Sequence, residues 1–295
     1  MKNLSGLKVC ALGILFREAV SRVWYGSGRF SPAWGFKAGN LKLLPLNEEG
    51  YNVTQCNTDV PKKCNILFLC VKPHIVDVVA AEIHPFLTTN HLVISVAAAV
   101  KISHLTAMLH SPCRVVRCMP NTCVTVSAGT CAISRGPNVD ADDVELVMGL
   151  LGSIGICEEV SEGIMDTVCG LSGSGPAYVF LVIQGMADGA VKMGMPRQLA
   201  LKFAAQTVMV SAPLCHHSIS AKGGWQDGPG ERLPTRRSSR TMCAPRAAPP
   251  HTASRPSRGR CVRAAFAEAV EAATRRGQEL GRKIEAAKNP SAAAP

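Results

Sequence analysis

Apolar residues recur in the first half of the chain as short runs that alternate with amphipathic segments. In the run 65–71, NILFLCV, every residue after Asn65 is apolar, which is typical of a strand covered on both faces. The next segment, HIVDVVAAEIHPFL, repeats its apolar positions at helical spacing. The same patterns predict strands at LKVCAL, HLVISVAAA, CRVVRCMP, GTCAIS and ICEEVS, and helices at KISHLTAMLH and VDADDVELVMGLLGSIG.

This order of elements predicts an α/β fold, with a Rossmann-like dinucleotide-binding domain of mostly parallel strands over residues 1–160. Acidic residues from Asp140 onward suit the start of the helix that they precede. After Ser161 the pattern is helical, and the helices are apolar on nearly all faces. Such helices must be buried, often against another subunit. We therefore predict an all-helical domain over 161–295, with the segment 211–262 aberrant and disordered.

Most of the net charge of +11 comes from one irregular segment. Between Glu231 and Arg263 the chain has nine arginines, no lysine and one acid. A run rich in arginine and proline cannot bury enough apolar surface to order itself. This location argues against a basic nucleic-acid-binding face, so we expect no nucleic-acid partner. Arg-rich binding of nucleic acid stays the less favoured alternative.

The remaining composition indicates a globular protein without a metal or membrane partner. The thirteen cysteines are scattered and form no Cys-x-x-Cys pair, which favours reduced thiols and no metal site. No uninterrupted apolar run reaches the ~18–20 residues that span a bilayer. The N-terminus lacks the layout of a secretory signal. We expect a cytoplasmic location, with a mitochondrial one as the alternative.

The most specific stretch is GLSGSGPAYVFLVIQGMADGAVKMGMP, residues 170–196. Gly173 and Gly175 permit close approach of backbone or ligand, and Pro176 suits a first helical turn. Spacing alone leaves a tight helix crossing equally open. The stretch strongly resembles the pyrroline-5-carboxylate reductase family, which reduces pyrroline-5-carboxylate to L-proline. The resemblance extends to NVTQCNTDVPKKCNILFLCVKPHI, SVAAAVKISHL, RVVRCMPNTCVTVSAGT and RAAFAEAVEAATRRGQELGRK.

The resemblance implies site residues, a cofactor and an assembly, and it implies that the helical domain over 161–295 is a dimerisation and substrate domain. The expected cofactor is NADPH or NADH, the substrate is pyrroline-5-carboxylate, and the assembly is a homo-oligomer. Asn57 matches a residue near the adenosine and Ala98 one beside the nicotinamide, where the family usually has Gly at the position of Ala99. The other cofactor residues implied are Gly13, Val71, Lys72, Pro73 and Asn121. The substrate residues implied are Glu162, Ser172, Gly173, Ser174 and Gly175.

Two departures from the family pattern predict impaired activity. The glycine-rich turn after the first strand keeps only Gly13, with Leu15 where a second glycine would let the pyrophosphate approach the backbone. The family's substrate loop, which resembles Pro-Gly-Gly-Thr-Thr, has no counterpart in the present reading frame. Codons compatible with Arg246–Pro250 spell Gly-Gly-Thr-Thr one base out of frame. We therefore hypothesise that 234–259 is a frame-shifted substrate loop, which leaves no intact catalytic residue to propose.

Two further alternatives stay open. A chain that keeps part of the helical domain could join an intact reductase as a non-catalytic assembly partner. A different imine or β-hydroxyacid reductase of related architecture is the other enzyme candidate, and the LSGSGPAYVF match argues against it.

Overall fold

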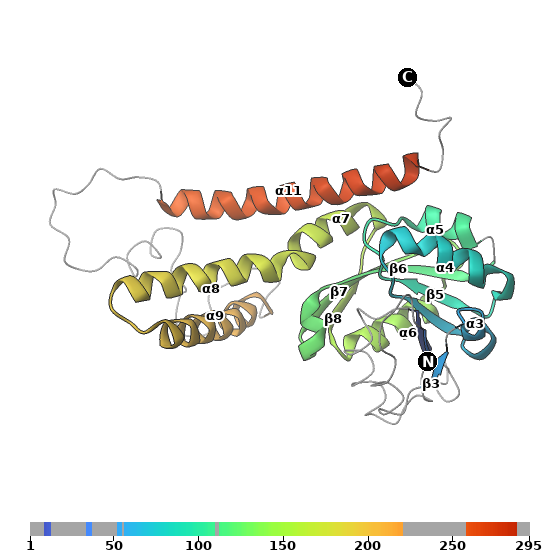
Figure 1. Cartoon of the computed structure of the whole chain (residues 1–295), viewed down its shortest axis with the longest axis horizontal. Helices are drawn as coiled ribbons and strands as arrows, with labels where there is room; N and C mark the ends of the chain where they lie inside the picture. The colour runs from blue at the N-terminus through green and yellow to red at the C-terminus, as the bar shows by residue number, and fades with distance from the viewer. Residues whose placement is uncertain are drawn as a thin grey trace, which may run out of the picture. The chain divides into compact units, whose positions relative to one another are not determined.

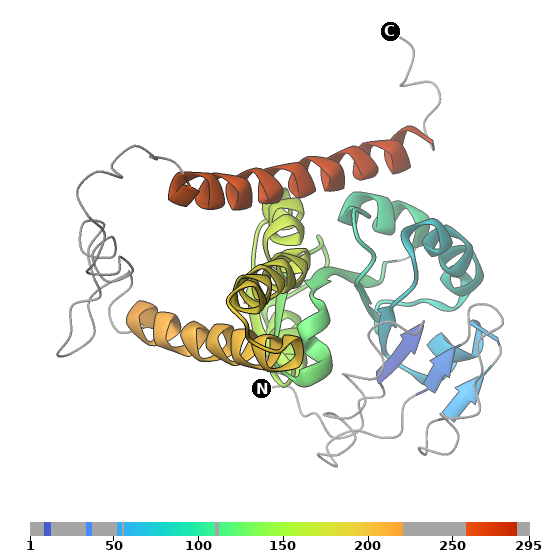
Figure 2. The ribbon, with the colours of Figure 1, turned by 60° about the vertical axis from the view of Figure 1, so that its left-hand side comes forward.

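The computed structural model describes residues 9–12, 34–36, 52–54, 56–109, 112–220 and 258–287. A sheet of eight strands organises the first part of this chain, in the order β3-β2-β1-β4-β5-β6-β7-β8. The strands are β1 (Val9–Leu12), β2 (Trp34–Phe36), β3 (Asn52–Thr54), β4 (Ile66–Leu69), β5 (Leu92–Ser95), β6 (Arg114–Pro120), β7 (Gly129–Arg135) and β8 (Gly155–Glu159). Figure 2 shows β1, β2 and β3 as blue arrows side by side.

The sheet is parallel except between β6 and β7, which are antiparallel. The strand order runs outward from β1 to β3 and then restarts on the other side of β1 with β4. Open parallel sheets bind ligands at such a reversal, beside the carboxyl ends of the strands. The predicted α/β fold with a Rossmann-like first domain is therefore confirmed.

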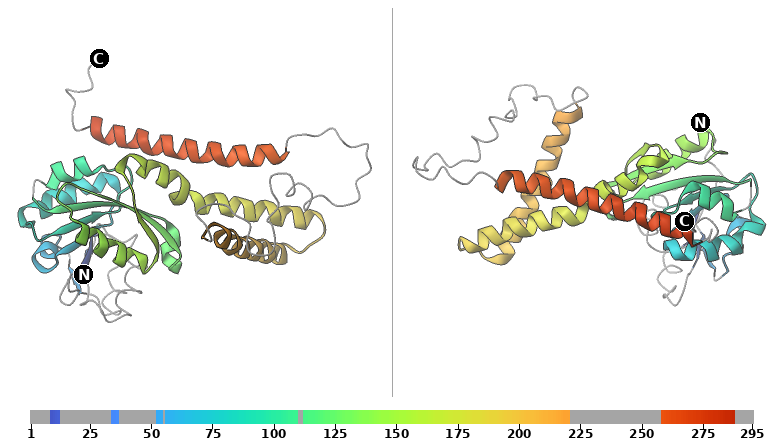
Figure 3. Two further views of the ribbon diagram at one scale, coloured as in Figure 1. Left: turned by 180° about the vertical axis from the view of Figure 1, so that it is seen from behind. Right: turned by 90° about the horizontal axis from the view of Figure 1, so that it is seen from above.

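Helices bury both faces of the sheet, as Figures 1 and 3 show. On one face, α4 (Val76–Ile83) and α5 (Ile102–Leu109) pack over alternate strand residues such as Leu67 and Val93. On the other face, α6 (Ala141–Gly152) packs over residues such as Phe68 and Ile94. Burial on both faces explains why β4 and β5 are continuously apolar in sequence. The strand and helix periods thus predicted this layer structure correctly.

The start of α6 follows the predicted acidic signal. The Asp140 carboxylate accepts a hydrogen bond from the backbone N–H of Asp143, and the Asp143 carboxylate accepts one from the backbone N–H of Asp140. This reciprocal capping satisfies two amides that the helix itself leaves unpaired. Asp143 is fully buried and also pairs with Arg114 on β6, which fixes α6 to the sheet.

Helices account for the second part of the described chain. They are η4 (Glu162–Ile164), α7 (Met165–Val168), η5 (Cys169–Gly173), α8 (Gly175–Lys192), α9 (Arg197–Ser220) and α11 (Arg258–Ala286). Within this part, α8 and α9 pack through small residues, with Ala187, Ala200 and Ala204 buried between them. η5 is a single turn of π-helix, and short π-turns occur often at functional sites.

The chain divides into two compact units at points other than the predicted boundary at 160/161. One unit comprises Met1–Pro176 with Ala267–Pro295, and the other comprises Ala177–Phe266. The first unit is longer than predicted because η4, α7 and η5 pack on the sheet domain. For example, the buried Arg117 of β6 contacts Glu162 and Asp166. The C-terminal part of α11 belongs to the same unit and adds Ile284 to its core.

Helices extend into both ends of the segment 211–262, for which we predict disorder. α9 continues to Ser220, and α11 begins at Arg258. The centre of the segment, 221–257, lies outside the described residues, as does the hypothesised frame-shifted loop within it.

One described helical stretch, Glu162–Lys192, is long and apolar enough to cross a membrane by length and composition. This differs from the expectation that no segment reaches that length. The expectation considered only uninterrupted apolar runs. In the structure, η5 joins α7 to α8, so the helical stretch also includes the glycines and serines between the apolar residues. Little of the stretch is buried, and its exposed apolar side chains include Phe180 and Leu181.

Candidate active site

The predicted cofactor residues of the central sheet follow successive parallel strands. Val71, Lys72 and Pro73 follow β4, Ala98 follows β5, and Asn121 follows β6. Because β4, β5 and β6 are parallel and adjacent, these residues meet at one edge of the sheet. Lys72 is exposed with an extended backbone, and Pro73 begins a 3₁₀ turn, η1 (Pro73–Ile75). The edge is the place where an α/β sheet binds a dinucleotide.

Asn57 has a buried polar atom without a partner. Its side chain is 5% exposed, and its Nδ2 donates to Glu82 Oε2 at 2.6 Å. Among the described residues nothing donates to its Oδ1. A buried acceptor without a donor is costly, so a site that supplies one is expected here. A hydroxyl or amine of an adenosine group would be such a donor, which fits the role that the resemblance implies for Asn57.

The turn 97–101 joins β5 to α5 and includes Ala98. At its start, the backbone N–H of Ala97 donates to Ser95 Oγ at 3.3 Å. At its centre, Ala99 has a φ of 63°, in the left-handed region that favours glycine. The family's preference for glycine at this position, noted from the sequence, therefore has a backbone reason. At its end, the backbone N–H of Ile102 donates to Glu162 Oε1 at 2.7 Å.

Asn121 connects the cofactor edge to the predicted substrate turn. Its Nδ2 donates to the backbone oxygen of Ser172 at 3.2 Å, and its Oδ1 accepts from the backbone N–H of Thr130 at 3.1 Å. Nearby, a side chain on Gly173 would have a Cβ 3.0 Å from Met119 Cε, so the lack of one lets η5 approach β6 closely. The structure thus brings one predicted cofactor residue and two predicted substrate residues together.

The predicted small-residue turn is a turn of π-helix, followed directly by α8. Ser172 Oγ donates to the Val168 carbonyl at 3.0 Å, and Ser174 Oγ donates to the Cys169 carbonyl at 3.3 Å. Each hydroxyl can still accept a hydrogen bond. A Cβ on Gly175 would meet no atom of the described residues within 4 Å, which leaves space beside the turn. α8 begins at Gly175, so Pro176 occupies its first turn as predicted.

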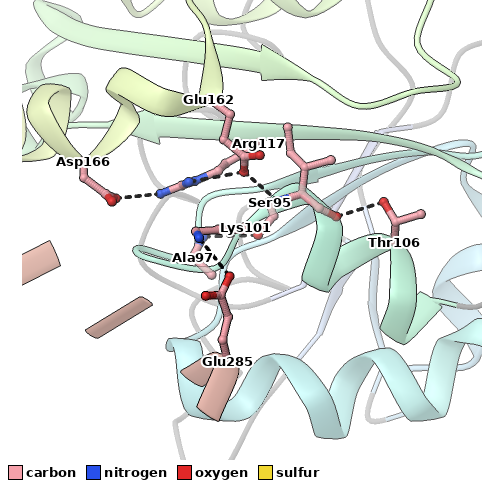
Figure 4. A network of polar contacts seen from close by, with 9 residues as sticks. Ser95, Ala97, Lys101, Thr106, Arg117, Glu162, Asp166 and Glu285 are labelled. Carbon is pink, nitrogen blue, oxygen red and sulfur yellow. Dashed lines mark hydrogen bonds and ion pairs between the residues drawn. The ribbon is translucent and has the colours of Figure 1, made fainter. Parts of the chain in front are cut away.

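A buried arginine that the sequence analysis missed lies beneath this site (Figure 4). Arg117 is 3% exposed, and its guanidinium donates to Glu162 at 3.3 Å and to Asp166 at 3.1 Å. Glu162, predicted near the substrate, therefore uses one oxygen to hold both Arg117 and the Ile102 amide. The available signal was an arginine inside the apolar strand CRVVRCMP, because a buried arginine requires anionic partners.

Glu162 also lines an open cleft of about 1160 Å³ between α5 and the ends of β7 and β8. The ion pair of Arg135 with Glu159 lies in the same cleft. The hydrogen bond from Arg135 lowers the pKa of Glu159, so this carboxyl stays ionised. Burial raises the pKa of Cys169, which keeps the thiol beside the π-turn neutral.

Gly13 lies outside the described residues, as does the rest of the predicted phosphate turn. The remaining predicted site residues are described, but only some contact one another. Asn121 contacts Ser172, whereas Asn57 lies in a separate contact with Glu82 on α4.

Two family models match separate parts of the chain. Residues 162–227 match the pyrroline-5-carboxylate reductase dimerisation model, and residues 37–99 match the model described as NADP oxidoreductase, coenzyme F420-dependent. A solved structure of a pyrroline-5-carboxylate reductase from Coxiella burnetii is similar, with a TM-score of 0.76, 25% identity and coverage of 93% of this chain and 98% of that one.

Two relatives show how far the similarity reaches along the sequence. Human pyrroline-5-carboxylate reductase 2 is 42% identical over 57% of this chain and 54% of its own length, so the chain spans about half of that relative. Pyrroline-5-carboxylate reductase 3 of Macaca fascicularis is 37% identical over 79% of this chain and 80% of its own length. The chain therefore belongs to the pyrroline-5-carboxylate reductase family.

Proposed function

We propose that this protein reduces the imine of pyrroline-5-carboxylate to L-proline with NADPH or NADH, as a homo-oligomer. The observation that carries the proposal is the hydrogen bond from Asn121 to the Ser172 backbone, because it joins the cofactor edge to the substrate turn in one site. The relative with 80% of its length covered supports the same reaction, and the dimerisation model over 162–227 supports the assembly.

The described residues fit a nicotinamide dinucleotide. Asn57 offers its Oδ1, which has no partner among the described residues, to the adenosine portion, and Lys72 offers an exposed ammonium near the carboxyl end of β4. Ala98 and Asn121 would face the nicotinamide portion. When bound, the reduced nicotinamide supplies the hydride that the imine carbon accepts.

The chain's own residues would orient the substrate rather than exchange its protons. Ser172 and Ser174 keep acceptor capacity on their hydroxyls, and Gly175 leaves space beside them. Hydride transfer requires the two carbons to be held about 3–3.5 Å apart, and correct positioning contributes up to ~7–11 kcal/mol. The loss of the glycine-rich turn and of the substrate loop from the sequence reduces this contribution. We therefore propose turnover far below that of an intact family member.

The test combines nucleotide binding with turnover by the purified full chain. We expect NADPH or NADH to bind weakly. We also expect proline to form slowly from pyrroline-5-carboxylate, as measured by mass spectrometry. Asn121→Ala should reduce both, since it separates the two halves of the site. Thr125→Ala in the exposed turn η3 (Thr122–Val126) is the matched control, and it should change neither. The proposal is wrong if the wild-type chain binds neither nucleotide and forms no proline.

A second candidate function is supported by exposed apolar residues on α8 and α9, among them Phe180, Leu181 and Phe203. Such a surface on a chain with an impaired site suits a non-catalytic assembly partner of an intact reductase. A mixing experiment, described below, separates this role from catalysis.

A further inference from the structure

We propose that Arg117 is a positioning residue for the turn 97–101, which it fixes through the carboxylate of Glu162. The inference rests on the proposed function in one respect, namely that this turn lies beside the nicotinamide. The link from Arg117 to the turn itself is independent of that function.

The first step is the burial of Arg117. Its side chain is 4% exposed, and removing a charge of this kind from water costs several kcal/mol unless it is paired. Its partners in the sheet register are Ser95 on β5 and Ser134 on β7, both buried. Its two anionic partners, Glu162 and Asp166, both come from the segment formed by η4 and α7. The guanidinium therefore fixes the position of that segment relative to β6.

The second step is the contact from Glu162 to α5. Glu162 Oε1 accepts the backbone N–H of Ile102, the first residue of α5, at 2.7 Å. The first amides of a helix have no partner within the helix, and they carry partial positive charge that favours an anion. A carboxylate sixty residues along the chain thus caps α5, because Arg117 holds it in place.

The third step compares the other contacts of the same turn. The Ala97 amide donates to Ser95 Oγ at its start, the Val100 amide donates to the Ala97 carbonyl within it, and the Leu105 amide donates to the Lys101 carbonyl at its end. Among the side-chain contacts of the described residues, Glu162 is the one that reaches the amide of Ile102 just after the turn. Lys101 pairs with Glu285 of α11 at 2.9 Å, but both side chains are more than 40% exposed. An exposed pair of this kind contributes little and is screened by salt. The contact through Arg117 and Glu162 is less exposed, because Arg117 is 4% and Glu162 is 32% exposed, and Figure 4 shows both contacts around the turn.

The geometry makes a selective prediction. Lys at position 117 would keep the charge but could not bridge two carboxylates with a planar fork. Glu162 would then hold Ile102 less firmly, and the turn would lose its fixed end. The nicotinamide half of a bound nucleotide would be affected, whereas the adenosine half near Asn57 would not.

The experiment measures two ligands and one amide in the full-length chain. The ligands are NADPH and 2′-phospho-ADP-ribose, which lacks the nicotinamide. We expect Arg117→Lys to raise the Kd of NADPH about tenfold. The Kd of 2′-phospho-ADP-ribose should stay within about twofold of the wild-type value. We also expect the Ile102 amide to exchange with deuterium at least tenfold faster, while amides of α6 do not change.

Arg114→Lys is the matched control. Arg114 lies on the same strand and pairs with the buried Asp143, but this contact leads to α6 and not to the turn. We expect this variant to leave NADPH affinity and Ile102 exchange near wild-type values. Glu162→Gln should reproduce the effects of Arg117→Lys, because it removes the charge that both contacts use.

The outcomes distinguish the two proposals. Equal loss of both ligands in Arg117→Lys would indicate general destabilisation and would overturn the positioning role. Unchanged Ile102 exchange in that variant would overturn it as well. If the wild-type chain binds neither of these ligands nor NADH and forms no proline, the proposed function fails, and Ile102 exchange alone still decides whether Arg117 fixes the turn.

Discussion

Ala99 occupies a position where the family resemblance implies glycine, and its backbone conformation is one that glycine adopts more easily. Its φ of 63° lies in a region that costs an L-residue with a Cβ about 1–2 kcal/mol. Glycine adopts this φ freely but loses more entropy on folding, about 0.5–1 kcal/mol. We therefore predict that Ala99→Gly raises the free energy of unfolding by about 0.5–1 kcal/mol, measured by urea titration of the full chain.

Ala97→Gly is the control for this effect, because Ala97 lies in the same turn without a positive φ. There the added flexibility brings no relief of strain, so the variant should lower the free energy of unfolding by about 0.5–1 kcal/mol. If both substitutions changed stability in the same direction, backbone strain at Ala99 would not be the cause.

At the scale of elements, Gly170 sets how closely η5 crosses α11. A Cβ at this position would lie 2.5 Å from Thr274 Oγ1 and 2.8 Å from the Val270 carbonyl oxygen. Backbone atoms of α11 cannot move aside cheaply, so Gly170→Ala should cost about 1–3 kcal/mol. Urea titration checks the loss, and faster hydrogen exchange in α11 locates it.

Gly163 offers a comparison within the same region. A Cβ at Gly163 would meet no atom within 4 Å, so Gly163→Ala should change stability by no more than about 0.5 kcal/mol. Equal losses at the two positions would point to an effect on the unfolded chain rather than to the helix crossing.

A charge cluster on α11 makes the helix sensitive to acid. Hydrogen bonds from Lys283 and Arg276 lower the pKa of Glu279 to about 2. A lowered pKa means that the carboxylate stabilises the folded helix above its ordinary pKa of 4.5, and that this stabilisation is lost as the pH falls towards 2. Titration of the Glu279 carboxyl carbon by NMR should give a midpoint near 2.

Removing the partners should reverse this shift. In the double variant Arg276→Ala, Lys283→Ala, we expect the midpoint to return towards 4.5. A Glu279 midpoint unaffected by the double substitution would contradict the assigned cause.

The elements that sequence predicted well are those in which local pattern and burial agree. β4 and β5 are apolar because both faces are covered, and α6 carries its own cap in Asp140 and Asp143. Contacts between residues that lie far apart in the sequence could not be predicted from the spacing of apolar residues alone. The Glu162 cap on Ile102 and the π-turn at Ser172 depend on how segments pack, which no local spacing encodes. The position of Ala98 after β5 follows from the order of the strands. The strain at Ala99 could be recognised only from its backbone φ in the structure.

At the scale of the whole molecule, the exposed apolar residues of α8 predict association. Phe180 is 63% exposed and Leu181 is 66% exposed, on a helical stretch that by composition could also enter a membrane. Apolar helix faces of this kind are normally covered by another element. Because Asp188 and Lys192 lie on the same helix, we favour a protein partner over lipid, and we predict dimers or larger assemblies in sedimentation velocity.

The variant Phe180→Asp, Leu181→Asp tests this association, and Val78→Asp on α4 is its control. Val78 is 56% exposed and apolar, but it belongs to the sheet domain and should leave the sedimentation coefficient unchanged. The double variant should sediment as a monomer. Flotation of the wild-type chain with lipid vesicles, combined with an unchanged sedimentation profile of the double variant, would favour the membrane instead.

The same surface decides whether the chain acts on an intact reductase. A chain with an impaired site that joins active subunits should lower their specific activity in proportion to its share of the mixture, because each mixed assembly contains fewer working sites. We predict this dose-dependent loss when the purified chain is refolded together with human pyrroline-5-carboxylate reductase 2, a relative that matches 57% of this chain. The double variant at Phe180 and Leu181 should cause no loss, since it lacks the apolar contact. If the wild-type and double-variant chains lowered activity equally, depletion of cofactor or substrate, rather than assembly, would explain the effect.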